Sequence, residues 1–190
     1  MIVNYKTNTI QVKLVYYGPA MSGKTTTLRH LFKKLNKEGE LTSIETTTGR
    51  TLFFDFGTLA FKGSDWNIKI LLYSATGQDF YASTRPATLQ GADGIIFVVD
   101  SNPELLDENL QSWNELKRFF QDFYDLPMVV CLNKQDLEEK ISEEIIREKL
   151  ELEMFQKMHL FKTIATEGEG VIPSFKKMLN YIFPGIDVGV

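Results

Sequence analysis

Short blocks of apolar residues alternate along the chain with longer segments whose apolar residues recur at helical spacing. Short blocks rich in β-branched and aromatic residues predict strands. The six predicted strands lie at residues 10–17, 51–59, 68–73, 94–99, 128–132 and 160–165. The helical spacing predicts helices at residues 25–35, 105–123, 145–155 and 172–182. Strands that alternate with helices in this way are typical of an α/β fold with a mostly parallel sheet.

One pair of strands is connected without a helix. Residues 51–59 and 68–73 are joined by a short segment that contains Gly63-Ser64-Asp65, which predicts a hairpin and one antiparallel edge strand. The other connections are helical crossovers. They predict a doubly wound, mostly parallel six-stranded sheet with flanking helices and a ligand site beyond the carboxyl ends of the strands. We expect a single domain over residues 1–190, because two domains would be cramped in this length.

A glycine-rich loop directly follows the first predicted strand. Residues 18–25 read Gly-Pro-Ala-Met-Ser-Gly-Lys-Thr and match the pattern GxxxxGKS/T just before a predicted helix. Glycines let the backbone N–H groups point at phosphate oxygens, and the following helix presents its positive end. The predicted phosphate-binding residues are Gly18, Pro19, Ala20, Met21, Ser22, Gly23, Lys24, Thr25 and Thr26. Lys24 would reach the β- and γ-phosphates, and the Thr25 hydroxyl would ligate Mg²⁺. An ordinary glycine turn is the alternative, which the flanking strand and helix disfavour.

A second motif follows the predicted strand at residues 128–132. Residues 133–136 read Asn-Lys-Gln-Asp and match the NKxD signature of guanine-specific P-loop proteins. The Asp136 carboxylate can accept hydrogen bonds from the ring N1–H and the exocyclic amine of guanine, a pattern that adenine does not offer. Lys134 can lay its methylene stem over the purine face, and Asn133 can tie this loop to the phosphate loop. A solvent-exposed polar turn is the alternative reading of these four residues.

A third segment fits the same kind of pocket. Ala165-Thr166-Glu167 resembles the fifth motif of guanine-nucleotide-binding proteins, in which the Ala165 N–H would meet the guanine O6. This short match is weak alone. The two motifs that precede it in the expected order support its assignment to the same nucleotide site.

Composition narrows the function classes further. The net charge of −4 and the pI of about 5.3 argue against a general nucleic-acid-binding protein, which needs a basic face. The single cysteine, Cys131, lies in an apolar run and is expected to be a buried, inert thiol. The longest apolar run, residues 95–99, is too short to span a bilayer, and neither Ile2 nor the last six residues match a lipidation motif. We therefore expect a cytoplasmic protein without an intrinsic membrane anchor.

Several segments resemble the MglA group of bacterial and archaeal small GTPases, and the resemblance covers nearly the whole chain. These segments are Tyr16-Tyr17-Gly18-Pro19, Arg50-Thr51-Leu52-Phe53-Phe54-Asp55-Phe56, Gly77-Gln78-Asp79-Phe80-Tyr81 and Asp93-Gly94-Ile95-Ile96-Phe97-Val98-Val99-Asp100-Ser101. The motif at residues 133–136 is also similar to that of Arf proteins. The resemblance implies a P-loop G domain that binds GTP and GDP with Mg²⁺ and hydrolyses GTP slowly.

The resemblance also implies roles for two switch segments. Gln78 would position the attacking water, and the Gly77 N–H would contact the γ-phosphate. Arg50 matches an arginine finger supplied in cis, which would stabilise charge on the transferring phosphoryl group. Thr51 is the candidate that ligates Mg²⁺ in the GTP state, with the threonines at residues 46–48 as alternatives. A surface amide is the alternative for Gln78, and a solvated arginine at a strand edge is the alternative for Arg50.

Three positions depart from the patterns of related proteins. Ser74 stands where Ras-like proteins usually place an aspartate that holds Mg²⁺ through water, although the MglA group also tends to carry a small hydroxyl residue here. Loss of this charge predicts weaker magnesium dependence. Thr76 replaces the proline that is common in the group, and residues 46–49 are less acidic than is typical.

The predicted function is a molecular switch that presents different loop shapes to its partners in the GTP and GDP states. The resemblance implies a dimeric roadblock-domain activator similar to MglB, further effectors, and a role in cell polarity or motility. A GTP-bound scaffold that does not hydrolyse is the first alternative, against which Gln78 and Arg50 argue. A P-loop kinase is the second, and the guanine signature fits it poorly.

Overall fold

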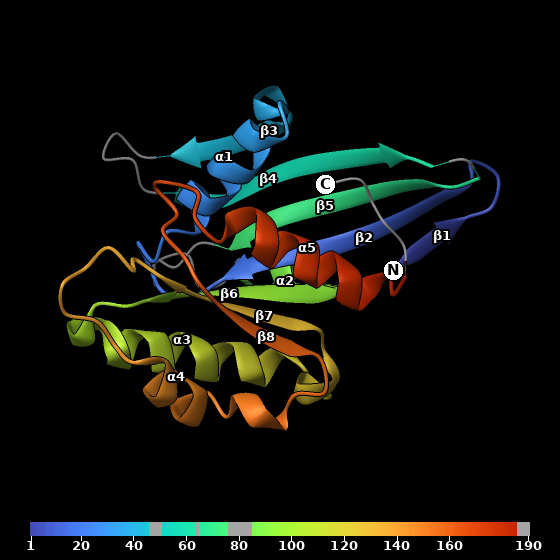
Figure 1. Ribbon diagram of the computed structural model, residues 1–190. Helices are drawn as coiled ribbons and strands as arrows, with labels where there is room; N and C mark the ends of the chain where they lie inside the picture. Colours follow the sequence, from blue (N-terminus) through green and yellow to red (C-terminus); the bar gives the residue numbers. More distant parts are fainter. Residues whose placement is uncertain (46–50, 64, 76–84, 186–190) are drawn as a thin grey trace.

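The computed structural model describes residues 1–45, 51–63, 65–75 and 85–185, with the backbone alone at residues 43–45 and 51–54. The strands are β1 (Ile2–Asn4), β2 (Thr9–Tyr17), β3 (Leu41–Glu45), β4 (Thr51–Lys62), β5 (Asn67–Ala75), β6 (Gly94–Asp100), β7 (Met128–Asn133) and β8 (Met158–Lys162). The α-helices are α1 (Lys24–Lys34), α2 (Arg85–Leu89), α3 (Leu106–Phe119), α4 (Glu143–Lys149) and α5 (Val171–Ile182). One sheet runs through the molecule, and helices cover both of its faces (Figure 1).

The strands follow the order β3-β4-β5-β2-β6-β7-β8, and β1 pairs with β2 outside this path. Four pairings are parallel: β2 with β5, β2 with β6, β6 with β7, and β7 with β8. The pairings of β3 with β4, β4 with β5 and β1 with β2 are antiparallel. The predicted α/β class, the helical crossovers and the β4–β5 hairpin are therefore confirmed.

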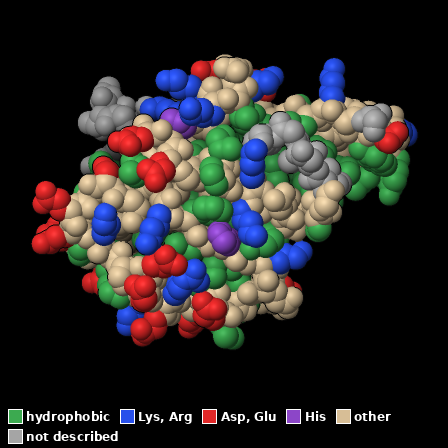
Figure 2. Space-filling view, viewed as in Figure 1, with side chains coloured by type: hydrophobic (Ala, Val, Ile, Leu, Met, Phe, Trp, Pro, Cys, Tyr) green, Lys and Arg blue, Asp and Glu red, His purple; other side chains and the backbone are tan. Residues whose placement is uncertain are grey.

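The prediction of six strands was wrong, because the described part of the chain forms eight. The edge strand was also assigned wrongly, since β3 lies outside β4. All three residues of β1 are exposed, and apolar side chains are visible at the end of the molecule where β1 lies (Figure 2). The added strands have three and five residues, and neither contains a long apolar block, so the pattern of apolar positions did not reveal them.

Some element ends also differ from the predictions. The last predicted strand, at residues 160–165, is β8 at Met158–Lys162, and the residues after it form a loop that reaches the site described below. Helix α3 ends at Phe119 instead of residue 123, and α4 ends at Lys149 instead of residue 155. The five-residue helix α2 is too short for a periodic pattern and was not predicted.

Two apolar clusters flank the sheet. Every residue of β6, from Gly94 to Asp100, is buried. This burial explains why residues 95–99 form an unbroken apolar run. Ile96 and Val98 face the cluster that contains α1 and α5, whereas Phe97 and Val99 face the cluster that contains α3 and α4. A strand covered on both faces is expected to be apolar at successive positions.

Cys131 lies within the sheet and is 1% exposed, as its apolar neighbours predict. Burial raises the pKa of its thiol to about 12, so the thiolate is suppressed at neutral pH. In the described part of the chain, no helix combines the length and apolar character needed to cross a bilayer.

Candidate functional site

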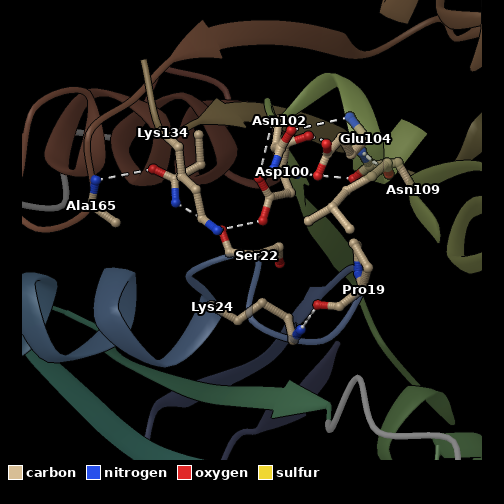
Figure 3. A network of polar contacts seen from close by, with 11 residues as sticks. Pro19, Ser22, Lys24, Asp100, Asn102, Glu104, Asn109, Lys134 and Ala165 are labelled. Carbon is tan, nitrogen blue, oxygen red and sulfur yellow. Dashed lines mark hydrogen bonds and ion pairs between the residues drawn. The ribbon is translucent and has the colours of Figure 1, made fainter. Parts of the chain in front are cut away.

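The carboxyl ends of β2, β6, β7 and β8 open onto one edge of the sheet. The phosphate-loop motif follows β2, Asp100 ends β6, the motif at residues 133–136 begins at the last residue of β7, and Ala165 lies in the loop after β8 (Figure 3). Segments far apart in the sequence are thereby brought into contact, as expected for a ligand site in an open α/β sheet.

Two glycines of the phosphate loop are required by close contacts. Gly18 has φ +142°, and a β-carbon there would overlap the carbonyl oxygen of Val98 on β6. Gly23 has φ +105° and precedes the first residue of α1, and a β-carbon there would overlap the Asn133 side-chain amide. The loop can therefore pass close to β6 and to the motif after β7 only with glycine at these positions.

Lys24 lies folded against its own loop. Its side chain is buried, and its ammonium group donates hydrogen bonds to the carbonyls of Gly18 at 2.9 Å and Pro19 at 2.5 Å. Burial, together with the nearby positive charge of Arg85, lowers the pKa of Lys24 to about 7 against the opposing effect of Asp55 and Asp100. An ammonium group held this way gains from an added negative charge, which a phosphate would supply.

A carboxylate that the sequence analysis did not select lies beside Thr25. The Thr25 hydroxyl donates to Asp55 Oδ2 at 2.6 Å, and Asp55 is fully buried. Asp55 on β4 lies directly opposite Ser74 on β5 in the antiparallel pair. Ser74 is 1% exposed, and its hydroxyl oxygen has no hydrogen-bond partner among the described residues.

Asp55 thus lies next to the position where Ras-like proteins usually carry the aspartate. A threonine hydroxyl, a carboxylate and a second hydroxyl are oxygen donors that suit Mg²⁺ and the water molecules around it. The sequence did carry a signal for Asp55, because a single carboxylate lies between Phe54 and Phe56 within a predicted strand. An isolated charge at such a position needs a polar partner if it is buried.

Asn133 joins three loops of the site. Its amide nitrogen donates to the Ser22 carbonyl at 2.7 Å, so the predicted tie between this loop and the phosphate loop is confirmed. Its side-chain oxygen accepts from the Thr163 hydroxyl at 3.1 Å and from the Ala165 N–H at 3.0 Å. The Ala165 N–H was predicted to meet a guanine oxygen, and in the structure it donates to Asn133.

The other residues of the motif at residues 133–136, called the base motif below, are less buried than Asn133. The Lys134 ammonium lies 2.5 Å from Asp100 Oδ2, and Lys134 has φ +65°. Asp136 and Thr166 lie at the same end of the sheet and have exposed side chains. A side chain that hydrogen-bonds to a bound base must be accessible in this way. The Gln135 amide donates to the Ser101 hydroxyl at 2.9 Å and fixes this loop to the end of β6.

The predicted switch residues fall largely outside the described part of the chain. Arg50, Gly77 and Gln78 lie outside the described residues. For Thr51 the structure describes the backbone at the start of β4, where it pairs with Glu45.

The sequence did not reveal a partly buried ion pair that acts electrostatically on Tyr17 and Lys24. Arg85, the first residue of α2, pairs with Glu115 of α3, and their side chains are 7% and 26% exposed. Burial and the Glu115 carboxylate raise the pKa of Tyr17, the residue just before the phosphate loop, well above its ordinary value. The start of α2, the middle of α3 and the phosphate loop are therefore electrostatically coupled.

Comparison with known proteins identifies a matching family and a similar relative. The model of the ADP-ribosylation factor family matches residues 1–182. The chain is 34% identical to the "Mutual gliding-motility protein MglA" of Myxococcus xanthus (strain DK1622) over 194 aligned positions, which cover 98% of each protein. Both matches extend over nearly the whole chain and include the loops at the carboxyl ends of the strands. The chain therefore belongs to the ADP-ribosylation factor family and is an MglA-like small GTPase.

Proposed function

We propose that residues 1–190 form one G domain that cycles between GTP and GDP states and controls partner binding through its two switch segments. The observation that carries this proposal is the position of Asn133. Its side chain holds the phosphate loop, the NKxD loop and the loop at Ala165 together at one edge of the sheet. These are the three segments that phosphate and guanine recognition require.

Each predicted nucleotide-binding residue keeps its role in this proposal. Residues 18–26 surround the phosphates, with Lys24 as the cation for the β- and γ-phosphates and the Gly77 N–H as a further donor. Asp136 reads the guanine edge, and Lys134 covers the purine face. Ala165 and Thr166 close the pocket on the side of the guanine O6. The Ala165 N–H would form a bifurcated hydrogen bond to the base and to the Asn133 side-chain oxygen.

We assign the magnesium site to Thr25 and Asp55, with Thr51 completing it in the GTP state. Magnesium neutralises phosphate charge when bound, and Asp55 would hold it through water in place of the aspartate that Ser74 replaces. The 2.6 Å contact between Thr25 and Asp55 supports this assignment. We therefore replace the expectation of weak magnesium dependence, which considered Ser74 alone, with an ordinary dependence.

The magnesium assignment is tested by the release of a fluorescent GDP analogue with and without a chelator. In the wild type, chelation should speed release strongly. In Asp55→Asn, we expect the effect of chelation to fall by about tenfold, because a charge-assisted contact contributes on the order of 1.5–3 kcal/mol. Asp107→Asn, an exposed aspartate on α3, is the matched control. An undiminished effect of chelation in Asp55→Asn contradicts the assignment.

For hydrolysis, we propose that Gln78 positions the attacking water and that Arg50 stabilises charge on the transferring phosphoryl group. Intrinsic turnover is slow and is stimulated by an activating protein. The name of the Myxococcus relative, a gliding-motility protein, supports a role in motility. Our candidate for the activator is a roadblock-domain dimer similar to MglB. We place the protein in the cytoplasm, where its GTP-bound state would bind effectors.

The overall proposal is tested by nucleotide content and turnover. We expect the purified protein to release GDP on denaturation, and single-turnover GTP hydrolysis with Mg²⁺ to be slowed by Gln78→Leu and by Arg50→Ala. Bound GTP without hydrolysis would favour a non-hydrolysing scaffold instead. Adenine nucleotide in the protein would overturn the base-pocket assignment. An unchanged rate in Arg50→Ala, alone and with an activator, would remove its catalytic role.

A further inference from the structure

Asp100 is a fully buried carboxylate at the carboxyl end of β6, between the phosphate loop and the base motif (Figure 3). Its neighbour on β7 is Asn133, the residue that joins the loops of the site. A charged side chain taken out of water is stable only with charge or hydrogen-bond partners. The partners of Asp100 therefore indicate what the carboxylate does.

The backbone of Asp100 is fixed from α3. The Asn109 side-chain oxygen accepts from the Asp100 N–H at 2.9 Å, and the Asn109 amide donates to the Asp100 carbonyl at 2.8 Å. The same amide donates to the Leu105 carbonyl at 2.7 Å, and Asn109 is fully buried. One carboxylate oxygen of Asp100 accepts from the Asn102 N–H at 3.1 Å. Asp100 is thus held at both its backbone and one oxygen.

The second carboxylate oxygen is directed at the base motif. Oδ2 lies 2.5 Å from the Lys134 ammonium, as an ion pair, and has no directed hydrogen bond from any other described residue. The Lys134 side chain is 34% exposed, so part of it stays accessible to a ligand while its ammonium group contacts the buried carboxylate. Its backbone at φ +65° is in the left-handed region, which a lysine rarely adopts without external support.

The connection between the two loops is reinforced nearby. The Ser101 N–H donates to the Asn133 carbonyl at 3.1 Å, and the Gln135 amide donates to the Ser101 hydroxyl. These bonds fix the backbones of the two loops and leave the Lys134 side chain to be fixed by Asp100. A long flexible side chain loses entropy when it is ordered, so ordering it before ligand binding lowers the cost of binding.

We propose that Asp100 is a positioning residue for the base pocket: it holds the Lys134 ammonium so that the lysine stem is already in place across the purine face. This inference rests on the proposed function, because it assumes that a guanine nucleotide occupies the site. Asp100 itself touches no part of the nucleotide in this proposal and acts through Lys134.

The test is a double-mutant cycle on release of a fluorescent GDP analogue in the presence of Mg²⁺. Asp100→Asn and Lys134→Met should each speed release on the order of tenfold, which corresponds to about 1.4 kcal/mol. The double variant should release the analogue no faster than the faster single variant, because both changes remove one contact. Asp107→Asn serves as the exposed control on α3 and should leave release unchanged.

The cycle separates a positioning role from a structural one. If Asp100 only supported the fold, or acted through Lys24, its replacement would speed release equally with and without Lys134, and the two effects would multiply to about a hundredfold. That result, or an unchanged release rate in Asp100→Asn, overturns the inference. Lys134→Met probes the same ion pair from its exposed partner, so an unchanged rate there overturns the inference even if Asp100→Asn does not fold. A wild-type protein that binds no GDP analogue would overturn the proposed function as well.

Discussion

Replacing Lys24 with methionine should stabilise the nucleotide-free protein while it weakens nucleotide binding. The side chain is 6% exposed, and its pKa is lowered from 10.5 to about 7, chiefly by burial. Because the folded-state pKa lies below the unfolded one, the lysine destabilises the fold. This cost is fully present below pH 7 and is lost as the pH rises from about 7 to 10.5.

The size of the effect follows from this shift and from the hydrogen bonds of the ammonium group. The shift from 10.5 to about 7, at about 1.4 kcal/mol for each pKa unit, corresponds to about 5 kcal/mol well below pH 7. At pH 7 the ceiling is about 4 kcal/mol, because about half of the folded molecules then carry the neutral amine. Methionine fills a similar volume but leaves the carbonyls of Gly18 and Pro19 without a donor, which costs on the order of 1 kcal/mol each. We therefore expect the free energy of unfolding to rise by about 1–2 kcal/mol in Lys24→Met.

The effect on binding has the opposite sign. An ammonium group on the β- and γ-phosphates is a charge-assisted contact, and its loss should weaken GDP binding at least a hundredfold, or about 3 kcal/mol. A protein that becomes more stable and binds its ligand less tightly has lost a group kept for function rather than for folding.

The assay is urea unfolding at pH 7 after the nucleotide has been removed with a chelator and a phosphatase. The fluorescence of Trp113, which is 2% exposed, reports unfolding of the core. Lys34→Met, on an exposed lysine in the last turn of α1, is the matched control and should change stability little. A nucleotide-free Lys24→Met protein that is less stable than the wild type would refute the reasoning from desolvation.

Three further predictions follow from the same geometry. GDP affinity should be constant below pH 7 and should fall toward tenfold per pH unit above it, because binding must then protonate Lys24, and calorimetry in buffers of different ionisation heat should detect the proton uptake. Gly23→Ala should lower the free energy of unfolding by about 1–3 kcal/mol and speed GDP release, because strain at φ +105° adds to a clash with the asparagine that joins the loops. Gly91→Ala, at φ +69° with open space around it, isolates strain alone in thermal unfolding, and equal losses in both variants would exclude the clash. Arg85→Met should destabilise by about 3 kcal/mol because it leaves the partly buried Glu115 unpaired, and adding Glu115→Gln should recover part of the loss in urea unfolding.

Features that depend on a local pattern of residues could be predicted without the structure. The strand at residues 94–99 and the one at 128–132 were predicted because covering both faces of a strand requires apolar residues at successive positions. The phosphate loop and the motif at residues 133–136 were predicted because each is a short run whose chemistry depends on its own spacing. The contact of Asn133 with the phosphate loop was also predicted correctly. Asn133 ends a strand that runs parallel to the one leading into the phosphate loop, so both lie at the same edge of the sheet.

Contacts between side chains on different strands depend on how the strands pair, and they became known from the structure. Asp55 lies beside Thr25 because β4 pairs with β5 in one register, and a shift of one residue would turn this carboxylate to the other face. Asp100 meets Lys134 because β6 lies next to β7, which a pattern of apolar residues does not specify. Strand order and register come from packing of the whole chain. The motifs could therefore be found from the sequence. The structure was needed to find Asp100, which contacts Lys134, and Asp55, which contacts Thr25.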